Sequence, residues 1–406
     1  MNVMFEQSFM ELYWQRNEMQ LQNYVSDSCN DLTVIDRKIY ELLSKSDISC
    51  YPFLLRTIVD TSPDCSFLVN KIDNFKDYEK NISDDDKKDT NQYKLKLAKA
   101  KKEDVIALMR VRGERAKALD FRSYPELVLS LDGLTKAKLR SILKKHLDEN
   151  RDSVRSLIEQ YQIKWPTWFS DLDNICDSKN NYSSDEQVQY LLSKLGLNLK
   201  GNLKFKVSSD NFASFVIPTS KENINVIIKE SNSSSEVLTL FHELGHAIHY
   251  SMIEGSGLSN VLPPSISEIM AVVMEYIATQ ILFEGDERKK LNDIMLIDYT
   301  RCAISSLFEL ELWENIAGAE ELYMKHYSQL GIEISNPSVW SSDSFRSIDV
   351  VYIHNYVLGY IIAKELYKKF TDAYGDNFSR WGNWLVENIY IHGSNLVLQD
   401  VMKIYI

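Results

Sequence analysis

Apolar residues recur with helical spacing over most of the chain. The periodicity covers residues 1 to about 73 and returns from about 94 to 164, where Leu139, Ile142 and Leu143 share one face. Two polar stretches, 74–94 and 171–187, interrupt it and predict exposed connections. We therefore expect a mainly α-helical protein with an N-terminal helical lobe over 1–170, a connecting loop over 171–187 and a catalytic lobe over 188–406.

A short β-rich passage opens the second lobe. The runs NLKFKV, ASFVIP and INVIIK, between residues 202 and 229, carry β-branched and aromatic residues between turn formers. They predict three short strands and hence a small sheet. Ser233 and Glu236 then form a capping box, which predicts a helix beginning near Ser233.

That helix carries a metal-binding pattern. Residues 241–249 read FHELGHAIH, which contains H-E-x-x-H. Because four residues advance a helix by about one turn, His242 and His246 project from the same face and can hold one tetrahedral zinc ion. Glu243 lies beside that face, where a carboxylate can serve as general base toward water. The pattern predicts a zinc metallopeptidase; the alternative is a pair of ordinary helix histidines.

The third metal ligand must come from another segment. A metzincin requires H-E-x-x-H-x-x-G-x-x-H, but His249 occupies the glycine position and Met252 the last histidine position, which excludes that class. We expect His249 to orient a ligand or to pack in the core rather than to bind the metal.

Two glutamates on the next helical pattern, SISEIMAVVMEYIATQIL, are the candidates. Glu268 and Glu275 are seven residues apart and share a helix face. Glu268 is the expected third ligand, although Ser265 would also make it the return residue of a capping box. Glu275 then either orients a ligating imidazole or is an ordinary helix charge.

Composition narrows the function further. The 406 residues include 46 Lys and Arg against 58 Asp and Glu, a net charge of −12 that repels phosphate backbones and argues against nucleic-acid binding. We see neither a signal-peptide pattern nor an apolar run of about 18 residues, so no membrane span is expected. The five scattered cysteines lack C-x-x-C pairs, which is typical of reduced, mostly buried thiols in a cytoplasmic protein. The sequence leaves the oligomeric state open.

These segments resemble the M3 metallopeptidases of the oligoendopeptidase F and thimet oligopeptidase type, in which H-E-[LF]-G-H precedes a helix bearing a ligand glutamate. The likeness rests on 241–249, on SEIMAVVME at 267–275, on VYIHNYVLGY at 351–360 and, more weakly, on 104–129. It implies a nearly all-α, zincin-like body with a deep channel, a small sheet bordering one zinc ion, and short peptides as substrates. It also implies that INVIIK pairs with an extended substrate.

The resemblance further implies donors for the oxyanion of the reaction. It favours Tyr352, His354 and Tyr356, with His354 standing where relatives tend to carry a tyrosine. On a regular helix Tyr352, Tyr356 and Tyr360 form one stripe from which His354 points away, and such a stripe is also typical of a core. The histidine that relatives carry several residues earlier is missing, and Arg346 occupies about that position.

Together, these patterns predict a zinc-dependent endopeptidase that acts on oligopeptides, although manganese or cobalt also suits such a site. Three rival functions stay open: a catalytically silent helical scaffold that binds peptides or a partner, a carboxypeptidase-type relative, and a protease acting on a folded protein. The chain lacks a His-Pro-Phe segment of the sort that the Taq carboxypeptidases carry, which argues against the second rival.

Overall fold

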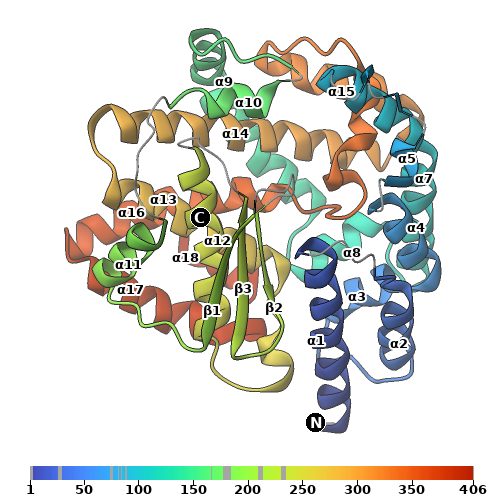
Figure 1. Ribbon diagram of the computed structural model, residues 1–406, viewed down its shortest axis with the longest axis horizontal. Helices are drawn as coiled ribbons and strands as arrows, with labels where there is room; N and C mark the ends of the chain where they lie inside the picture. Colours follow the sequence, from blue (N-terminus) through green and yellow to red (C-terminus); the bar gives the residue numbers. More distant parts are fainter. Residues whose placement is uncertain are drawn as a thin grey trace.

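Helices make up most of the protein, which the computed structural model describes over residues 3–25, 30–73, 76–80, 82–83, 85–86, 89–165, 167–176, 184–208, 214–229 and 235–405 (Figure 1). The mainly α-helical fold class with one small sheet is confirmed. The α-helices are α1 (Val3–Val25), α2 (Thr33–Ser44), α3 (Leu54–Asp60), α4 (Pro63–Asp73), α5 (Lys76–Glu79), α7 (Thr90–Ala118), α8 (Tyr124–Leu131), α9 (Lys136–Gln160), α10 (Trp168–Asp173), α11 (Ser184–Leu195), α12 (Ser235–Met252), α13 (Pro264–Leu282), α14 (Gly285–Leu312), α15 (Ala319–Tyr327), α16 (His354–Tyr374), α17 (Phe378–Asn388) and α18 (Leu398–Tyr405). The 3₁₀ helices are η1 (Gly257–Asn260), η2 (Ile316–Gly318), η3 (Ser328–Leu330), η4 (Pro337–Ser342), η5 (Ser344–Arg346) and η6 (Tyr390–Asn395).

The sheet consists of the three predicted strands, β1 (Asn202–Ser208), β2 (Phe215–Pro218) and β3 (Asn223–Lys229). Its order is β1-β3-β2, with β1 parallel to β3 and β2 antiparallel to it. Because β3 is paired on both sides, its segment INVIIK offers no free edge, and the expectation that it pairs with a substrate is wrong. The order of strands along a chain does not reveal their order in a sheet. Among the described strands, the free edges belong to β1 and β2.

The hydrophobic core extends across both predicted lobes. One large cluster of buried residues includes Leu143 of α9 and Leu244 of α12, and a smaller one joins α1 to α3 with Leu258 of η1. The stretch Gly257–Leu282 is the one described segment that is long and apolar enough to cross a membrane, and 78% of its apolar window is buried within the protein. That burial is typical of a core helix. The division into two lobes and the cytoplasmic location stay predictions.

Two glycines let helix α13 pack closely between α12 and α16. A Cβ atom at Gly245 of α12 would lie 2.7 Å from Cα of Ala271 and 2.9 Å from Cβ of Met274. A Cβ atom at Gly359 of α16 would lie 2.8 Å from Cβ of Val272. These approaches are shorter than any side chain tolerates, so the absence of a Cβ sets the spacing of the three helices that carry the predicted site.

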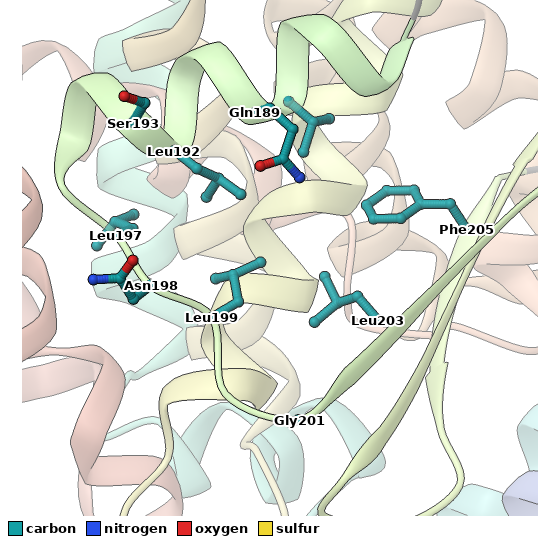
Figure 2. A pocket seen from close by; sticks show the side chains of 10 residues that line it. Gln189, Leu192, Ser193, Leu197, Asn198, Leu199, Gly201, Leu203 and Phe205 are labelled. Carbon is teal, nitrogen blue, oxygen red and sulfur yellow. The ribbon is translucent and has the colours of Figure 1, made fainter.

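A groove of about 510 Å³ lies between α11 and β1 (Figure 2). Its lining residues are mainly apolar, and they are Val188, Gln189, Leu192, Ser193, Leu197, Asn198, Leu199, Gly201, Leu203 and Phe205. None of the predicted site residues belongs to this set, so the groove is separate from the metal-binding pattern.

The cysteines that the structure describes differ in burial, and the thiols of Cys50, Cys65 and Cys302 are free. Cys50 is exposed, whereas Cys65, Cys176 and Cys302 are buried; Cys29 lies outside the described residues. Burial raises the pKa of Cys65 to about 11, so this thiol stays protonated and behaves as a small apolar side chain.

Candidate metal centre

The H-E-x-x-H segment lies in the middle of helix α12. The described helix begins at Ser235, and Ser233 of the predicted capping box lies outside the described residues. His242 and His246 project from the same face, with ring centroids 5.0 Å apart. Glu243 is buried beside them. The local helix that the motif requires is therefore present.

Helix α13 brings Glu268 to the two imidazoles. Its Oε1 lies 3.0 Å from Nε2 of His242, and its Oε2 lies 3.7 Å from Nε2 of His246. One donor atom from each of the three residues lies within 4.8 Å of the others. Ser265 does not form a capping box with Glu268, because α13 begins at Pro264 with Pro263 as its N-cap, so Ser265 lies inside the helix; its hydroxyl donates to Oδ1 of Asp132. The alternative role predicted for Glu268, as the return residue of a capping box, is therefore absent from this helix.

The cluster fits a divalent cation. Oε1 of Glu268 is buried and, apart from the 3.0 Å approach of Nε2 of His242, has no hydrogen-bond partner in the described part of the chain. Each imidazole uses Nδ1 for a contact on its far side, which leaves Nε2 directed at the carboxylate. Two imidazoles and one carboxylate, with a fourth position left for water or substrate, form a ligand set of catalytic zinc sites.

The far-side contacts of the imidazoles come from three residues. Nδ1 of His242 lies 3.3 Å from Oε2 of Glu275, which also accepts a hydrogen bond from the hydroxyl of Tyr299. Nδ1 of His246 lies 2.9 Å from Oγ of Ser267. Such partners orient a ligating ring and set which nitrogen faces the metal. The sequence pattern indicates Glu275 but not Ser267, which adjoins the candidate glutamate ligand in α13, nor Tyr299, which comes from α14 and has no local sequence signal.

Contacts from Ser267 continue to the N-terminal helix. The side chain of Tyr250 in α12 lies beside those of Ser267 and of Tyr13 in α1. Tyr13 also lies beside Asn17, whose side-chain amide donates to the carbonyl of Pro218 in β2 at 2.8 Å. Helix α1 and strand β2 therefore connect to a neighbour of Ser267, although the first 90 residues carried no functional signal in the sequence.

Burial and opposing charges set the protonation of the site residues. Burial raises the pKa of Glu243 to about 7, with His242 acting in the opposite sense. Burial also lowers the pKa of His246 to about 4, which favours the neutral imidazole that binds metals. Burial opposes the ionisation of Glu268, but the nearby imidazoles outweigh it and hold the pKa of this carboxyl below its usual range. An anionic carboxylate and a neutral imidazole suit a cation.

Tyr352 and Tyr356 lie against the metal-binding residues. The hydroxyl of Tyr352 donates to Oε2 of Glu268. The ring of Tyr356 stacks on that of His242, with centroids 5.8 Å apart and planes inclined by 14°. Helix α16 begins at residue 354, so Tyr352 precedes it and the expected single helical stripe of tyrosines does not form. Both tyrosines nevertheless reach the site.

His354, His249 and Arg346 are turned into the core. His354 is 2% exposed, and its Nε2 has no hydrogen-bond partner within the described ranges. Both ring nitrogens of His249 are likewise buried without a partner there, which matches a packing role. Arg346 is buried with Nη1 3.5 Å from Oε2 of Glu309. The structure brings none of the three side chains to the metal-binding residues, so His354 is not retained as an oxyanion donor.

Comparison with known proteins gives the fold its context. No protein-family model matches the chain, and no curated protein matches its sequence. The M32 carboxypeptidase from Deinococcus radiodurans R1 is similar in structure, with a TM-score of 0.64 and 12% identity, over 99% of this chain and 93% of that chain. For Trypanosoma cruzi metallocarboxypeptidase 1 the TM-score is 0.63 and the identity 15%, over 98% of this chain and 94% of that chain. For a structure assigned to oligoendopeptidase F the TM-score is 0.62 and the identity 13%, over 92% of this chain and 80% of that chain. The chain therefore shares the overall fold of these peptidase structures, and the M3 resemblance stays a prediction.

Proposed function

We propose that this protein is a zinc-dependent metallopeptidase that cuts peptide bonds within oligopeptides. The observation that carries the proposal is the approach of His242, His246 and Glu268, which place one donor atom each within 4.8 Å of one another. Structural neighbours named as carboxypeptidases and an oligoendopeptidase support peptides as the substrate class. We assign these three residues as ligands of one zinc ion and Glu243 as the general base.

The side chains around the metal have distinct roles in this proposal. Bound zinc supplies a Lewis acid that polarises a water molecule and the scissile carbonyl. Glu243 takes a proton from the water and passes it to the leaving amine, and a pKa of about 7 suits both transfers near neutral pH. Tyr352 and Tyr356 donate to the oxyanion. Tyr352 lies beside the ligand set, where its hydroxyl donates to Glu268; its one proton would turn from that carboxylate to the oxyanion during the reaction.

The β2 edge is the proposed docking strand for an extended peptide. β2 pairs with β3 on one side and packs against α12 and α1, so it lies near the metal-binding helix. An edge strand can hydrogen-bond the peptide backbone on either side of a scissile bond without using a chain end. This geometry supports internal cleavage.

Carboxypeptidase activity is the second candidate, and chain length favours it. The two carboxypeptidase structures match 98–99% of this chain over 93–94% of their own length, whereas the oligoendopeptidase F structure matches 92% of this chain over 80% of its length. Peptides with a free or an amidated C-terminus separate the two activities when the products are identified by mass spectrometry. Internal cleavage of both peptides supports the endopeptidase. Stepwise loss of C-terminal residues from the free peptide alone supports the carboxypeptidase.

The zinc-dependent chemistry is tested by metal content and peptide cleavage together. We expect one zinc ion per purified chain, cleavage that stops with chelator, and recovery on adding zinc. Glu243→Gln should keep the metal but abolish cleavage, whereas His246→Ala should lose both. A chain that binds zinc stoichiometrically but cleaves no peptide would instead be a silent scaffold, and full activity of Glu243→Gln removes Glu243 from its assigned role.

A further inference from the structure

The residue before Tyr352 has an unusual backbone conformation. Val351 has a φ of 53°, in the left-handed region that β-branched residues rarely adopt. The other two described non-glycine residues with positive φ are Asp120 and Gln162, which are polar. Such backbone strain persists only where surrounding contacts enforce it. Here it sits beside a proposed oxyanion donor.

A buried carboxylate supplies one of these contacts. The amide N–H of Val351 donates to Oε1 of Glu309 at 2.8 Å, while Oε2 of the same carboxylate lies 3.5 Å from Nη1 of Arg346. Glu309 is 3% exposed, so both interactions lie in the core. The two carboxylate oxygens of Glu309 therefore have separate partners. Oε2 pairs with the guanidinium of Arg346, and Oε1 accepts from the backbone amide of the strained residue Val351.

Two arginines hold the same loop from the N-terminal half of the chain. Nη2 of Arg56 donates to the carbonyl of Val350 at 3.1 Å, and Nη1 of Arg112 donates to the carbonyl of Ser347 at 2.5 Å. These contacts fix the loop on the N-terminal side of Val351. The contact to Glu309 then fixes the peptide unit from which Tyr352 extends.

We propose that Glu309 is a positioning residue for Tyr352: by holding the left-handed backbone at Val351, it aims the Tyr352 hydroxyl at Glu268. This inference rests on the proposed function, since Tyr352 is taken as a donor beside the zinc ligands. An ion pair with Arg346 alone would require no contact between Glu309 and the backbone of Val351. The contact that is present links α14 to the ligand set through a single strained residue.

The test is a double-mutant cycle on zinc affinity, measured by competition with a chelator. Tyr352→Phe removes the hydrogen bond to Glu268 and should weaken zinc binding about 10-fold, as expected for an outer partner of a ligand. Glu309→Leu should cause a similar loss, whereas Glu309→Gln, which keeps an acceptor for Val351, should stay within about 2-fold. The variant with both Glu309→Leu and Tyr352→Phe should bind zinc no more weakly than Tyr352→Phe alone.

A backbone variant covers the case in which Glu309→Leu does not fold because Arg346 loses its partner. Val351→Gly leaves the ion pair between Glu309 and Arg346 intact but frees the peptide unit before Tyr352. This variant should weaken zinc binding in the chain that has Tyr352 and leave it unchanged in the Tyr352→Phe chain. Asp120→Gly, at another left-handed position in an exposed turn, is the matched control and should leave zinc affinity unchanged.

The outcomes separate this inference from the proposed function. Losses that multiply in the double variant, or an unchanged zinc affinity in both Glu309→Leu and Val351→Gly, overturn the positioning role. In an active enzyme the positioning variants should lower kcat about 10-fold while KM stays within about 2-fold. If the wild-type chain binds zinc and cuts no peptide, the proposed function fails, and the zinc cycle still decides the role of Glu309.

Discussion

The hydroxyl of Tyr299 donates a hydrogen bond of 2.5 Å to Oε2 of Glu275. The same oxygen lies 3.3 Å from Nδ1 of His242, so Tyr299 orients the carboxylate that orients a proposed ligand. Tyr299→Phe should weaken zinc binding about 10-fold, read by chelator competition. Tyr360→Phe is the control, because its ring lies 5.1 Å from that of Tyr299 and the change keeps the ring. Equal zinc affinities for the two variants would contradict the orienting role.

Ser267 should act on the other imidazole. Ser267→Ala removes the only polar partner of His246 Nδ1 that the described structure contains, and we expect zinc binding to weaken about 10-fold. Ser265→Ala, two residues earlier in the same helix, breaks a hydrogen bond to Asp132 but touches neither imidazole. It should change thermal stability without changing zinc affinity. Weaker zinc binding by Ser265→Ala, with unchanged binding by Ser267→Ala, would contradict the role of Ser267 as a partner of His246.

Gly245 should be required by packing rather than by chemistry. Gly245→Ala places a methyl group 2.7 Å from Cα of Ala271, and such overpacking costs about 1–3 kcal/mol in the free energy of unfolding. Gly113→Ala in α7 meets no atom within 4 Å and should stabilise the helix by about 0.5–1 kcal/mol. Denaturant titration of both variants measures the difference. A stable Gly245→Ala protein with unchanged zinc affinity would refute the close-packing argument.

Activity should rise with pH through the titration of Glu243. Burial raises the pKa of this carboxyl to about 7, and a bound zinc ion adds a nearby positive charge that lowers the pKa. Because a general base must be ionised, kcat/KM should fall about tenfold per pH unit below a pKa at or under about 7, and level off above it. A profile of kcat/KM between about pH 5 and 8 checks this. A flat profile over that range would contradict the assignment.

Acid should destabilise the protein through His146, a buried residue of α9. Burial lowers the pKa of His146 to about 4, so between that pH and about 6.5 the unfolded chain binds a proton that the folded chain does not. The contribution of His146 to the free energy of unfolding is complete above about pH 6.5. As the pH falls toward 4, up to about 3 kcal/mol of this free energy is lost. Urea unfolding of the wild type and of His146→Gln over this pH range measures the loss. The variant should show a shallower decline, and an identical decline would exclude His146 as a source.

Local spacing explains what the sequence could predict. His242 and His246 lie one helical turn apart, and spacing leaves Glu268 and Glu275, on one face of the next helix, as candidates for the third ligand. The structure brings Glu268 to the two imidazoles. The fold class likewise follows from periodicity, and the three strands follow from β-branched and aromatic residues between turn formers. By contrast, Ser267 and Tyr299 act through contacts between helices, which no spacing within one helix encodes.

The expectations for INVIIK and His354 differ from the structure because tertiary contacts, rather than local spacing, decide both positions. The resemblance implies that the segment INVIIK pairs with a substrate, but tertiary assembly places β3 between two other strands. The family resemblance favours His354 beside Tyr352 and Tyr356, although helical spacing points His354 away from the tyrosines. The left-handed backbone at Val351 and the start of α16 at residue 354 bring both tyrosines to the site while His354 is buried away from it. Single-residue backbone conformations of this kind have no signal in a pattern of apolar residues.

The close contact of α13 with α12 and α16 has a consequence for how the metal is acquired. Because these helices lie in the continuous core, opening them locally costs a large part of the free energy of unfolding. The ligand geometry is therefore preorganised, unlike that of a zinc finger, which folds around its ion. Capture of the proposed zinc ion would therefore not have to order the chain, and the affinity of the chain for the ion should reflect the ligands and their neighbours rather than the stability of the fold.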